Sequence, residues 1–317
     1  MKKVAAIVVT HNRKELLCTC LESIRRQTLA PDAIYIVDNH SEIDTAETLL
    51  SNHYISSLPD TFASHDSVIS HHILSLDGKT NIRIVYIYKH LNDGGAGGFY
   101  AGMKVAYHDE YEWLWMMDDD GIPAENGLDH LLTGAYTYNL DYANALVVNI
   151  NDKYTLSFGW ERVKKTIADY TGVDIVRNAA NPFNGTLINR KIPEKIGFVK
   201  KEMFLLGDEM EYLYRSLKNG FSVATIVKSI HYHPPEKGKV VLVFPGCRRF
   251  PILIYENSRG AIYYRNLGYI EYTYKTTWEV WKTFIKYSIF FLSRLRLREY
   301  GIFCRSFING CRNRFDK

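Results

Sequence analysis

The chain has 317 residues, which is more than the roughly 250–300 at which a single hydrophobic core stops growing, so we expect either one large α/β domain with a C-terminal appendage or two domains. Hydrophobic residues make up 46% and charged residues 23%, which is typical of a globular protein and excludes a disordered chain, a collagen and a low-complexity tail. The formal net charge of +4 is too small to indicate a nucleic-acid partner.

The five cysteines are odd in number and scattered along the chain. They predict neither a disulfide framework nor a zinc site built from cysteine pairs, and a reducing, cytoplasmic setting is expected. The apolar run Val4–Val9 is shorter than the ~7–15 residues of a signal-peptide core, so it is interpreted as a buried strand. No stretch approaches the ~20 apolar residues of a membrane-spanning helix.

The first 150 residues alternate between predicted strands and predicted helices. Continuous apolar runs predict buried strands, and apolar residues at helical spacing predict helices. In chain order these are a strand over 4–9, a helix over 13–27, a strand over 33–37, a helix capped by Ser41 and ending at Leu50, a strand over 82–88, a helix ending at Ala106, a strand over 113–117, a helix over 126–138 and a strand over 143–150. This alternation predicts βαβ units and a mostly parallel sheet.

The pattern breaks between His53 and Asn81, a polar stretch with four histidines. A surface insertion is favoured over a metal cluster, because the histidine spacings match no helical ligand pair. Later in the chain we expect a helix over 207–219, a strand over 221–232 and helices over 251–266 and 274–298.

Four polar motifs follow predicted strands. They are Thr10-His11-Asn12-Arg13, Asp38-Asn39, the glycine-rich stretch 92–98 and the triplet Asp118-Asp119-Asp120. Ligands of parallel sheets bind beyond the carboxyl ends of the strands, so the four motifs together predict a single site.

The aspartate triplet predicts a divalent cation. Three adjacent carboxylates would repel one another in a desolvated cleft, and Mn²⁺ or Mg²⁺ bound to a phosphorylated ligand would remove that penalty. Asp118 and Asp120 are alternate residues and therefore the natural pair to reach one face. A solvated turn closed by Gly121 is the alternative.

Three further segments contribute candidate groups. The glycine-rich stretch permits close backbone approach and precedes a helix whose amides favour anions, although a tight turn explains it almost as well. In the segment 207–212, Glu211 can pair with Arg215, which leaves Asp208 or Glu209 as a candidate general base. The alternative is that these carboxylates only form a cluster that caps the N-terminus of the helix. His231 and His233 point to the same side of a strand, where imidazole can complete the coordination of a metal such as Mn²⁺.

Taken together, these segments resemble family 2 glycosyltransferases, which are inverting, metal-dependent enzymes. The motifs are IVVTHNR (7–13), VDNHS (37–41), NDGGAGGFYAG (92–102), WLWMMDDDGIP (113–123), NPFNGTLINR (181–190), GDEMEYLYR (207–215), the segment 231–233 and YYRN (263–266). The resemblance covers about residues 3–266 and extends to the galactofuranosyltransferase-like branch, which builds bacterial surface glycans, O-antigens and mycobacterial cell-wall arabinogalactan from UDP-galactofuranose.

This resemblance implies a GT-A fold, that is, a Rossmann-like, mostly parallel sheet with helices on both faces. The catalytic domain would span 1–250, with a nucleotide-sugar half over 1–150 and an acceptor half over 151–250. A C-terminal helical region would span 251–317.

The resemblance also implies donor-binding roles. Thr10, Asn12 and Asp38 would hold the uracil and ribose, Arg13 would lie near the diphosphate, and Asp119 would be a further donor-binding residue. The glycines that would shape the donor pocket are Gly94, Gly95, Gly97 and Gly98. Asp118 and Asp120 would meet the metal, with His233 preferred over His231 as the further ligand.

On the acceptor side, the resemblance implies that Glu209 matches the catalytic base. The family usually shows an aspartate at this position, so Asp208 remains the alternative base. Asn184, Gly185 and Glu211 would line the acceptor site. The carboxylate would deprotonate an acceptor hydroxyl, which attacks the anomeric carbon from the face opposite the departing UDP.

Apolar and aromatic residues recur at helical spacing between Trp278 and Leu292, followed by Arg294, Arg296 and Arg298. Such a face suits a membrane interface, and the alternatives are packing on the catalytic domain or on a second subunit. The expected partners are a UDP-sugar donor and a glycan or lipid-linked acceptor, with the protein peripheral on the inner face of the cell membrane.

Three other functions are considered at this level. A transferase using dTDP-rhamnose or another hexose donor shares the same phosphate motifs. A nucleotidyltransferase also uses carboxylates and a metal, but it usually needs a basic phosphate loop, and GGAGGF has no Lys or Arg. A carbohydrate-binding module without catalysis would leave the carboxylates unexplained.

Overall fold

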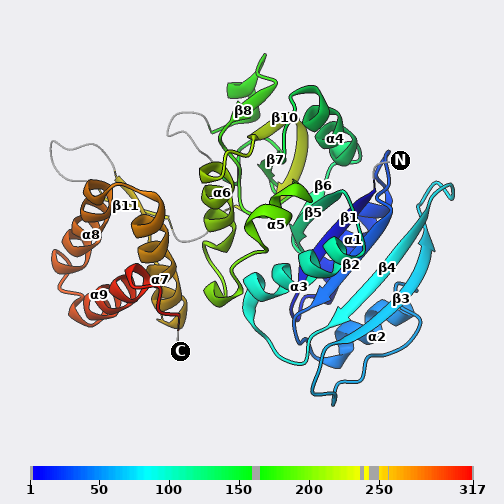
Figure 1. The fold of residues 1–317 in the computed structure, drawn as a ribbon, viewed down its shortest axis with the longest axis horizontal. Helices are drawn as coiled ribbons and strands as arrows, with labels where there is room; N and C mark the ends of the chain where they lie inside the picture. Colours follow the sequence, from blue (N-terminus) through cyan, green and yellow to red (C-terminus); the bar gives the residue numbers. More distant parts are fainter. Residues whose placement is uncertain (1–2, 159–164, 236–238, 243–249, 256, 316–317) are drawn as a thin grey trace. The chain divides into compact units, whose positions relative to one another are not determined.

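A computed structural model describes residues 3–158, 165–235, 239–242, 250–255 and 257–315. The chain forms two compact units, coloured by sequence in Figure 1. The first comprises Met1–Lys201 and Ser216–Pro235, and the second comprises Glu202–Arg215 and Glu236–Lys317. The predicted boundary after residue 250 stays a prediction, and Cys247 lies outside the described residues.

One mixed β-sheet forms the centre of the first unit. Within the described residues its strand order is β3-β4-β2-β1-β5-β9-β7-β10-β6, and β8 pairs with β10. The strands are β1 (Val4–Thr10), β2 (Ala33–Asp38), β3 (Ser67–Leu74), β4 (Asn81–Tyr88), β5 (Trp113–Asp118), β6 (Ile122–Pro123), β7 (Tyr142–Asn149), β8 (Ile175–Arg177), β9 (Thr186–Asn189) and β10 (Val223–His233).

The strands β4, β2, β1 and β5 run parallel, as the βαβ pattern predicts. Thr10 pairs with Asp38, and the neighbouring Val9 pairs with Asp118, so these strands end at the same edge of the sheet. Strand β9 lies antiparallel between β5 and β7 and makes the second half of the sheet mixed.

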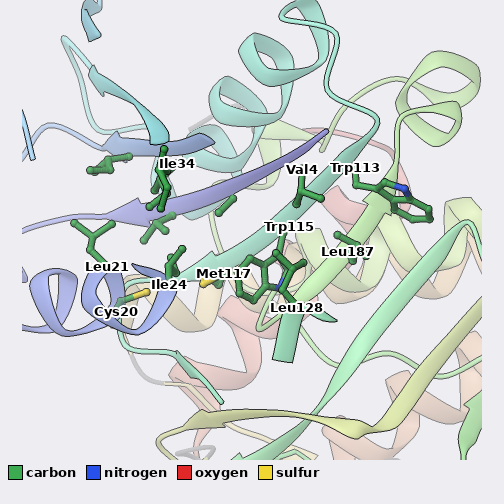
Figure 2. Packing of buried hydrophobic residues seen from close by; sticks show 14 of the residues in the cluster. Val4, Cys20, Leu21, Ile24, Ile34, Trp113, Trp115, Met117, Leu128 and Leu187 are labelled. Atoms are coloured by element: carbon green, nitrogen blue, oxygen red, sulfur yellow. The ribbon is translucent and has the colours of Figure 1, made fainter. Parts of the chain in front are cut away.

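Helices cover both faces of the sheet. Buried side chains of α1 (Lys14–Arg25), α2 (Ile43–Ser51) and α4 (Gly127–Thr137) form one hydrophobic cluster with alternate strand residues, and Figure 2 shows part of it around Trp115. Helix α3 (Gly94–His108) covers the opposite face, where Gly98 and Gly102 abut side chains of β1. The shorter helices of this unit are η1 (Ile167–Tyr170) and α5 (Lys191–Ile196).

Two local predictions in this unit were wrong. Ser41 does not cap α2: the N-cap residue is Glu42, without a side-chain cap, and Ser41 Oγ accepts a hydrogen bond from the Asn12 amide at 2.9 Å. The glycine-rich stretch is not a loop before a helix, because α3 begins at Gly94. The polar stretch 53–81, for which a surface insertion was predicted, contains the edge strand β3, which pairs antiparallel with β4 along its length.

The second unit is built around three helices, α7 (Asn257–Tyr274), α8 (Thr277–Leu292) and α9 (Leu297–Cys311), shown in orange and red in Figure 1. Their core is aromatic and includes Tyr264, Phe291 and Phe303. The same unit holds β11 (Lys239–Leu242), β12 (Phe250–Leu253), most of η2 (Lys201–Met203) and the start of α6 (Asp208–Lys218).

The helix limits predicted here were wrong in two places. Residues 250–253 form β12 rather than a helix, and the predicted helix 274–298 is divided between α7, α8 and α9. The helix is interrupted between α7 and α8 by a capping box that begins α8. In this box the side chains of Thr276 and Glu279 each accept a hydrogen bond from the other residue's backbone N–H. No helix among the described residues combines the length and apolarity required to span a membrane.

Candidate active site

The aspartate triplet lies where β5 ends, beside the end of β1. Thr10 Oγ1 donates to Asp119 Oδ2 at 2.7 Å, and both residues are buried. The Arg13 guanidinium reaches two carboxylates, Asp119 Oδ1 at 3.1 Å and Asp120 Oδ2 at 3.0 Å. The first and the fourth of the predicted strand-end motifs therefore meet here and form one network of a hydroxyl, a guanidinium and carboxylates.

The members of the triplet differ in their electrostatics. Burial, with a smaller contribution from the Asp120 charge, raises the pKa of Asp119 to about 6, although Thr10 and Arg13 oppose the shift. Burial also acts to raise the pKa of Asp120, but His233 and Arg13 outweigh it and hold that pKa below its usual value. Asp118 is half-buried at the end of β5. Of Asp119 and Asp120, Asp120 is therefore the carboxylate that stays ionised more readily.

Strand β10 brings His233 to the triplet. The short strand β6, directly after the triplet, pairs antiparallel with β10 through His231 and Tyr232. This register places His233 Nε2 3.2 Å from Asp120 Oδ1. His233 is therefore the histidine that the fold joins to the carboxylates.

His231 lies deeper in the same strand and is fully buried. Its ring lies between Gly121 and Gly185, where an added Cβ would fall 2.2 Å and 2.9 Å from the ring nitrogens Nε2 and Nδ1. Neither nitrogen has a hydrogen-bond partner among the described residues, and burial lowers the pKa of His231 to about 3. We therefore expect His231 to act as a neutral packing residue, and a metal-binding role for it stays a prediction.

The residues at this edge fit a divalent cation that also binds phosphate. Asp120 Oδ1 is buried and receives no hydrogen bond of good geometry from the described residues, although His233 Nε2 is close. Carboxylate and imidazole together suit Mn²⁺, and carboxylate with phosphate oxygens suits Mg²⁺. Across the described ranges, no three His, Cys, Asp or Glu side chains converge into a finished metal site.

Asp38 and Asn12 organise the loops beside the triplet. Asp38 is buried, and its two oxygens accept hydrogen bonds from the Ser41 amide at 2.7 Å and from Tyr86 Oη at 2.8 Å. Asn12 is exposed, has a positive φ of 53° and binds the start of α2 through its side chain. Of these two predicted donor ligands, only Asn12 presents its side chain at the surface.

The glycines of α3 serve two purposes. A Cβ on Gly97 would fall 2.0 Å from the Asp93 carboxyl carbon, and one on Gly98 would fall 2.5 Å from a Val9 methyl group, so both positions are required for packing. A Cβ on Gly95 would meet nothing within 4 Å. Of these three, Gly95 is the one that leaves backbone accessible to a ligand.

Two residues at this edge were not among the predicted ligands. Lys89, directly after β4, is buried, and its Nζ contacts both Asp93 oxygens at 2.5 Å. Asn39, directly after β2, donates to Asn92 Oδ1 at 3.0 Å and to the Gly94 carbonyl at 2.9 Å. The strand-end rule that selected Asp38 applies equally to both, so their position was the available signal.

The predicted acceptor residues Asn184 and Gly185 directly precede β9. Because Thr186 of β9 pairs with Met116 of β5, these residues lie near the carboxyl end of β5. Asn184 is buried, and its Oδ1 has no hydrogen-bond partner among the described residues. Gly185, with a φ of +72°, provides room for the His231 ring.

The predicted catalytic segment lies in the second unit, at the start of α6. Asp208 is buried, and Glu209 is half-buried with Oε2 3.3 Å from the Gly207 amide. Glu211 accepts from Arg215 at 3.0 Å, which confirms the predicted pairing, and from Tyr274 Oη at 2.7 Å. Glu211 is therefore a buried anchor of the helix, and its acceptor role stays a prediction.

A model of the family described as "Glycosyl transferase family 2" matches residues 5–58 and 69–205, which is more than half of the chain. The chain belongs to glycosyl transferase family 2. Galactofuranosyltransferase GlfT1 of Mycolicibacterium smegmatis is 29% identical over 279 residues, covering 84% of this chain and 82% of the relative. GlfT1 of Mycobacterium tuberculosis is 28% identical over 278 residues, with coverage of 85% and 82%.

Solved structures of low sequence identity confirm the GT-A type of fold for this family 2 member. S. aureus TarS 1–349 superposes with a TM-score of 0.60 at 13% identity, covering 99% of this chain and 82% of that one. GalNAc-T7, solved with UDP, GalNAc and Mn²⁺, gives a TM-score of 0.51 at 15% identity, with coverage of 74% and 44%.

Proposed function

We propose that this family 2 member is an inverting galactofuranosyltransferase that transfers galactofuranose from UDP-galactofuranose to a hydroxyl of a glycan or lipid-linked acceptor in bacterial surface polysaccharide synthesis. The observation that carries the donor assignment is the similarity to GlfT1, which extends over 84% of the chain rather than over the nucleotide half alone.

The carboxylate network supports binding of the nucleotide diphosphate. Arg13 supplies a fixed positive charge between Asp119 and Asp120, and Asn12 and Gly95 leave polar groups or backbone accessible at the same edge. Asp38 lies beneath this surface and would act on the uridine through Ser41 and the loop that it holds.

Asp118, Asp120 and His233 would hold Mn²⁺ or Mg²⁺ with the donor. When bound, such an ion neutralises negative charge on the diphosphate. The protein's own part is to keep Asp120 ionised, which His233 and Arg13 do by lowering its pKa.

We assign the proton-accepting role to the start of α6. Glu209, or Asp208 as the alternative, takes the proton of the acceptor hydroxyl as its oxygen bonds to the anomeric carbon. The bond between that carbon and UDP breaks at the opposite face, so the configuration inverts and no covalent intermediate with the enzyme is formed.

The proposal is tested by measuring nucleoside diphosphate release with Mn²⁺, a lipid-linked or oligosaccharide acceptor, and UDP-galactofuranose, UDP-galactopyranose, UDP-glucose or dTDP-rhamnose as the donor. We expect turnover with UDP-galactofuranose at least tenfold above the others. Asp120→Asn should lower kcat/KM by on the order of 100-fold, since it removes an ionised carboxylate at the diphosphate. Glu47→Gln, which changes an exposed carboxylate on α2, is the matched control and should retain the activity.

Two outcomes would reject the donor assignment. Faster release of dTDP from dTDP-rhamnose would assign the rhamnosyl alternative. Release of pyrophosphate from UTP in the presence of a sugar 1-phosphate, with no nucleoside diphosphate released from any of these donors, would assign a nucleotidyltransferase.

A further inference from the structure

Helix α8 carries an apolar stripe on the side that faces away from its core. Trp278, Trp281, Ile285, Ile289 and Leu292 follow one another at spacings of three or four residues and so share a face. All five are exposed, and Trp278 is 72% and Trp281 57% exposed. The residues that α8 packs inward, Tyr287 and Phe291 among them, belong to the aromatic core of the second unit.

The stripe continues past the end of α8. Leu295, in the short connection to α9, is 82% exposed, and Leu297, the first residue of α9, is 64% exposed. Monomeric proteins rarely leave so many large apolar side chains exposed in one contiguous run, so this surface indicates an interaction site.

Basic residues surround the stripe. Residues 275–315 contain nine Lys and Arg but only Glu279 and Glu299 as acids, a net charge of +7, whereas the whole chain carries +4. The remainder of the chain is therefore net negative. Lys282 lies four residues after Trp278, and Lys286 four residues after Lys282, so both form a row along one side of the stripe.

Both acids of this region are already engaged. Glu279 forms the capping box with Thr276, and Glu299 accepts from Arg296 at 3.0 Å. Glu271, Glu279 and Glu299 attract Lys286, Lys282 and Arg298 respectively. The nine basic residues nevertheless outnumber these three acids, so the region keeps an excess of positive charge.

This charge distribution selects the partner. A second copy of the chain would place the same excess of positive charge against this one across a two-fold interface, which is repulsive. An anionic lipid surface would accept the tryptophans among its headgroups and attract the lysines and arginines.

We propose that the stripe on α8, with the basic residues beside it, docks the protein on the surface of a membrane that contains anionic lipids. The helix lies in the plane of the interface, with Trp278 and Trp281 among the headgroups and Lys282, Lys286 and Arg298 facing phosphate. This inference is independent of the donor sugar, because it rests on residues of the second unit alone.

The test is co-sedimentation of the full chain with vesicles of phosphatidylcholine containing about 30% phosphatidylglycerol. We expect association in about 0.1 M salt, and a loss of at least tenfold in about 0.5 M salt or with phosphatidylcholine alone. Lys282→Gln with Arg298→Gln should weaken the partition about 25-fold, since each basic residue near an anionic surface contributes about fivefold. Trp278→Ser with Trp281→Ser should weaken it at least as much.

Phe62→Ser is the matched control, because Phe62 is a 97% exposed aromatic residue of the first unit, and it should bind vesicles as the parent does. Thermal unfolding of each variant shows that it is folded. The proposal is overturned if the folded parent stays in the supernatant with anionic vesicles, or if the tryptophan and Phe62 variants bind equally. The stripe would instead be assigned to a second copy if three results came together. The parent would form dimers in sedimentation velocity, only the tryptophan variant would lose them, and the parent would not associate with vesicles. Because no substrate is present, failure here leaves the proposed transferase activity untouched.

Discussion

Asp119 is held by two hydrogen-bond donors, yet its environment still favours the neutral acid. Its Oδ2 accepts from Thr10 and its Oδ1 from Arg13, but burial dominates and raises the pKa to about 6. Since the pKa of an unfolded aspartate is about 3.9, folding favours the protonated form. The stabilisation is complete below the unfolded pKa and is lost as the pH rises through about 6.

We therefore expect Asp119→Asn to gain stability relative to the parent as the pH rises from 4 to 7. The change in the difference between their free energies of unfolding should be about 3 kcal/mol, corresponding to a pKa shift of roughly two units. Urea unfolding at a series of pH values, with EDTA and without nucleotide, measures it. A pH-independent difference between the two proteins would contradict the expected shift at Asp119.

At the scale of single residues, the sequence was sufficient to predict which side chains lie together at the edge of the sheet. It was not sufficient to predict which residues pack around each of them. Thr10, Arg13 and the aspartates follow strands that the apolar pattern identifies, so their convergence could be predicted. The burial of His231 could not, because it depends on Gly121 and Gly185, which come from distant segments and leave room for the ring. Lys89 was overlooked because its partner Asp93 was interpreted as part of a loop.

At the scale of elements, helix α3 is positioned by its glycines. A Cβ on Gly102 would fall 2.5 Å from an Ile7 methyl group and 2.8 Å from a Val37 methyl group, whereas Gly95 has open space. The close approach of α3 to the sheet thus requires Gly102, and nothing in the packing requires Gly95.

Gly102→Ala should lower the free energy of unfolding by about 1–3 kcal/mol, because it overpacks the contact between α3 and the sheet. Gly95→Ala should raise it by up to about 1 kcal/mol, because alanine is the better helix former. Urea unfolding of the two variants measures both changes in the free energy of unfolding. Equal changes would show that the position of α3 does not depend on the contact between Gly102 and the sheet.

Asn266 joins two segments of the second unit that are distant in sequence. Its fully buried Nδ2 donates to the carbonyls of Met203, Leu205 and Leu206 at 2.9, 2.9 and 3.0 Å. The segment it holds includes Leu206 and Gly207 at positive φ and leads directly into the proposed base at the start of α6.

We expect Asn266→Ala to destabilise the protein by about 3 kcal/mol or more, because buried carbonyls lose their donor. Where the variant remains folded, kcat should fall while the KM for the donor stays within about twofold, since the donor edge is built from other residues. Ser306→Ala, a half-buried polar residue of α9, is the control. A fall in donor affinity with unchanged kcat would contradict a role for Asn266 in positioning α6.

At the scale of the whole molecule, the alternation of strands and helices over residues 1–150 was sufficient to predict the class of fold. It was not sufficient to place β9 between β5 and β7, because antiparallel insertion depends on contacts remote in sequence. The C-terminal helices were only partly predictable. Their aromatic residues line both the buried core and the exposed stripe of α8, and composition alone does not separate the two faces.

The residues proposed to bind the donor and the residue proposed to deprotonate the acceptor belong to different units. The carboxylate edge belongs to the sheet of the first unit, and Glu209 belongs to the second. Variants at the sheet edge should therefore act first on donor binding, and variants at the start of α6 on turnover.

Titration calorimetry of UDP into the full chain, with Mn²⁺ or with EDTA, tests the role of the carboxylate edge most directly. We predict binding that weakens at least tenfold in EDTA and, with Mn²⁺ present, at least tenfold on Asp120→Asn, while Glu47→Gln binds as the parent does. UDP that binds the Asp120→Asn variant as tightly as the parent, or binds equally in EDTA, would contradict the assignment of the site to Asp118, Asp120 and His233.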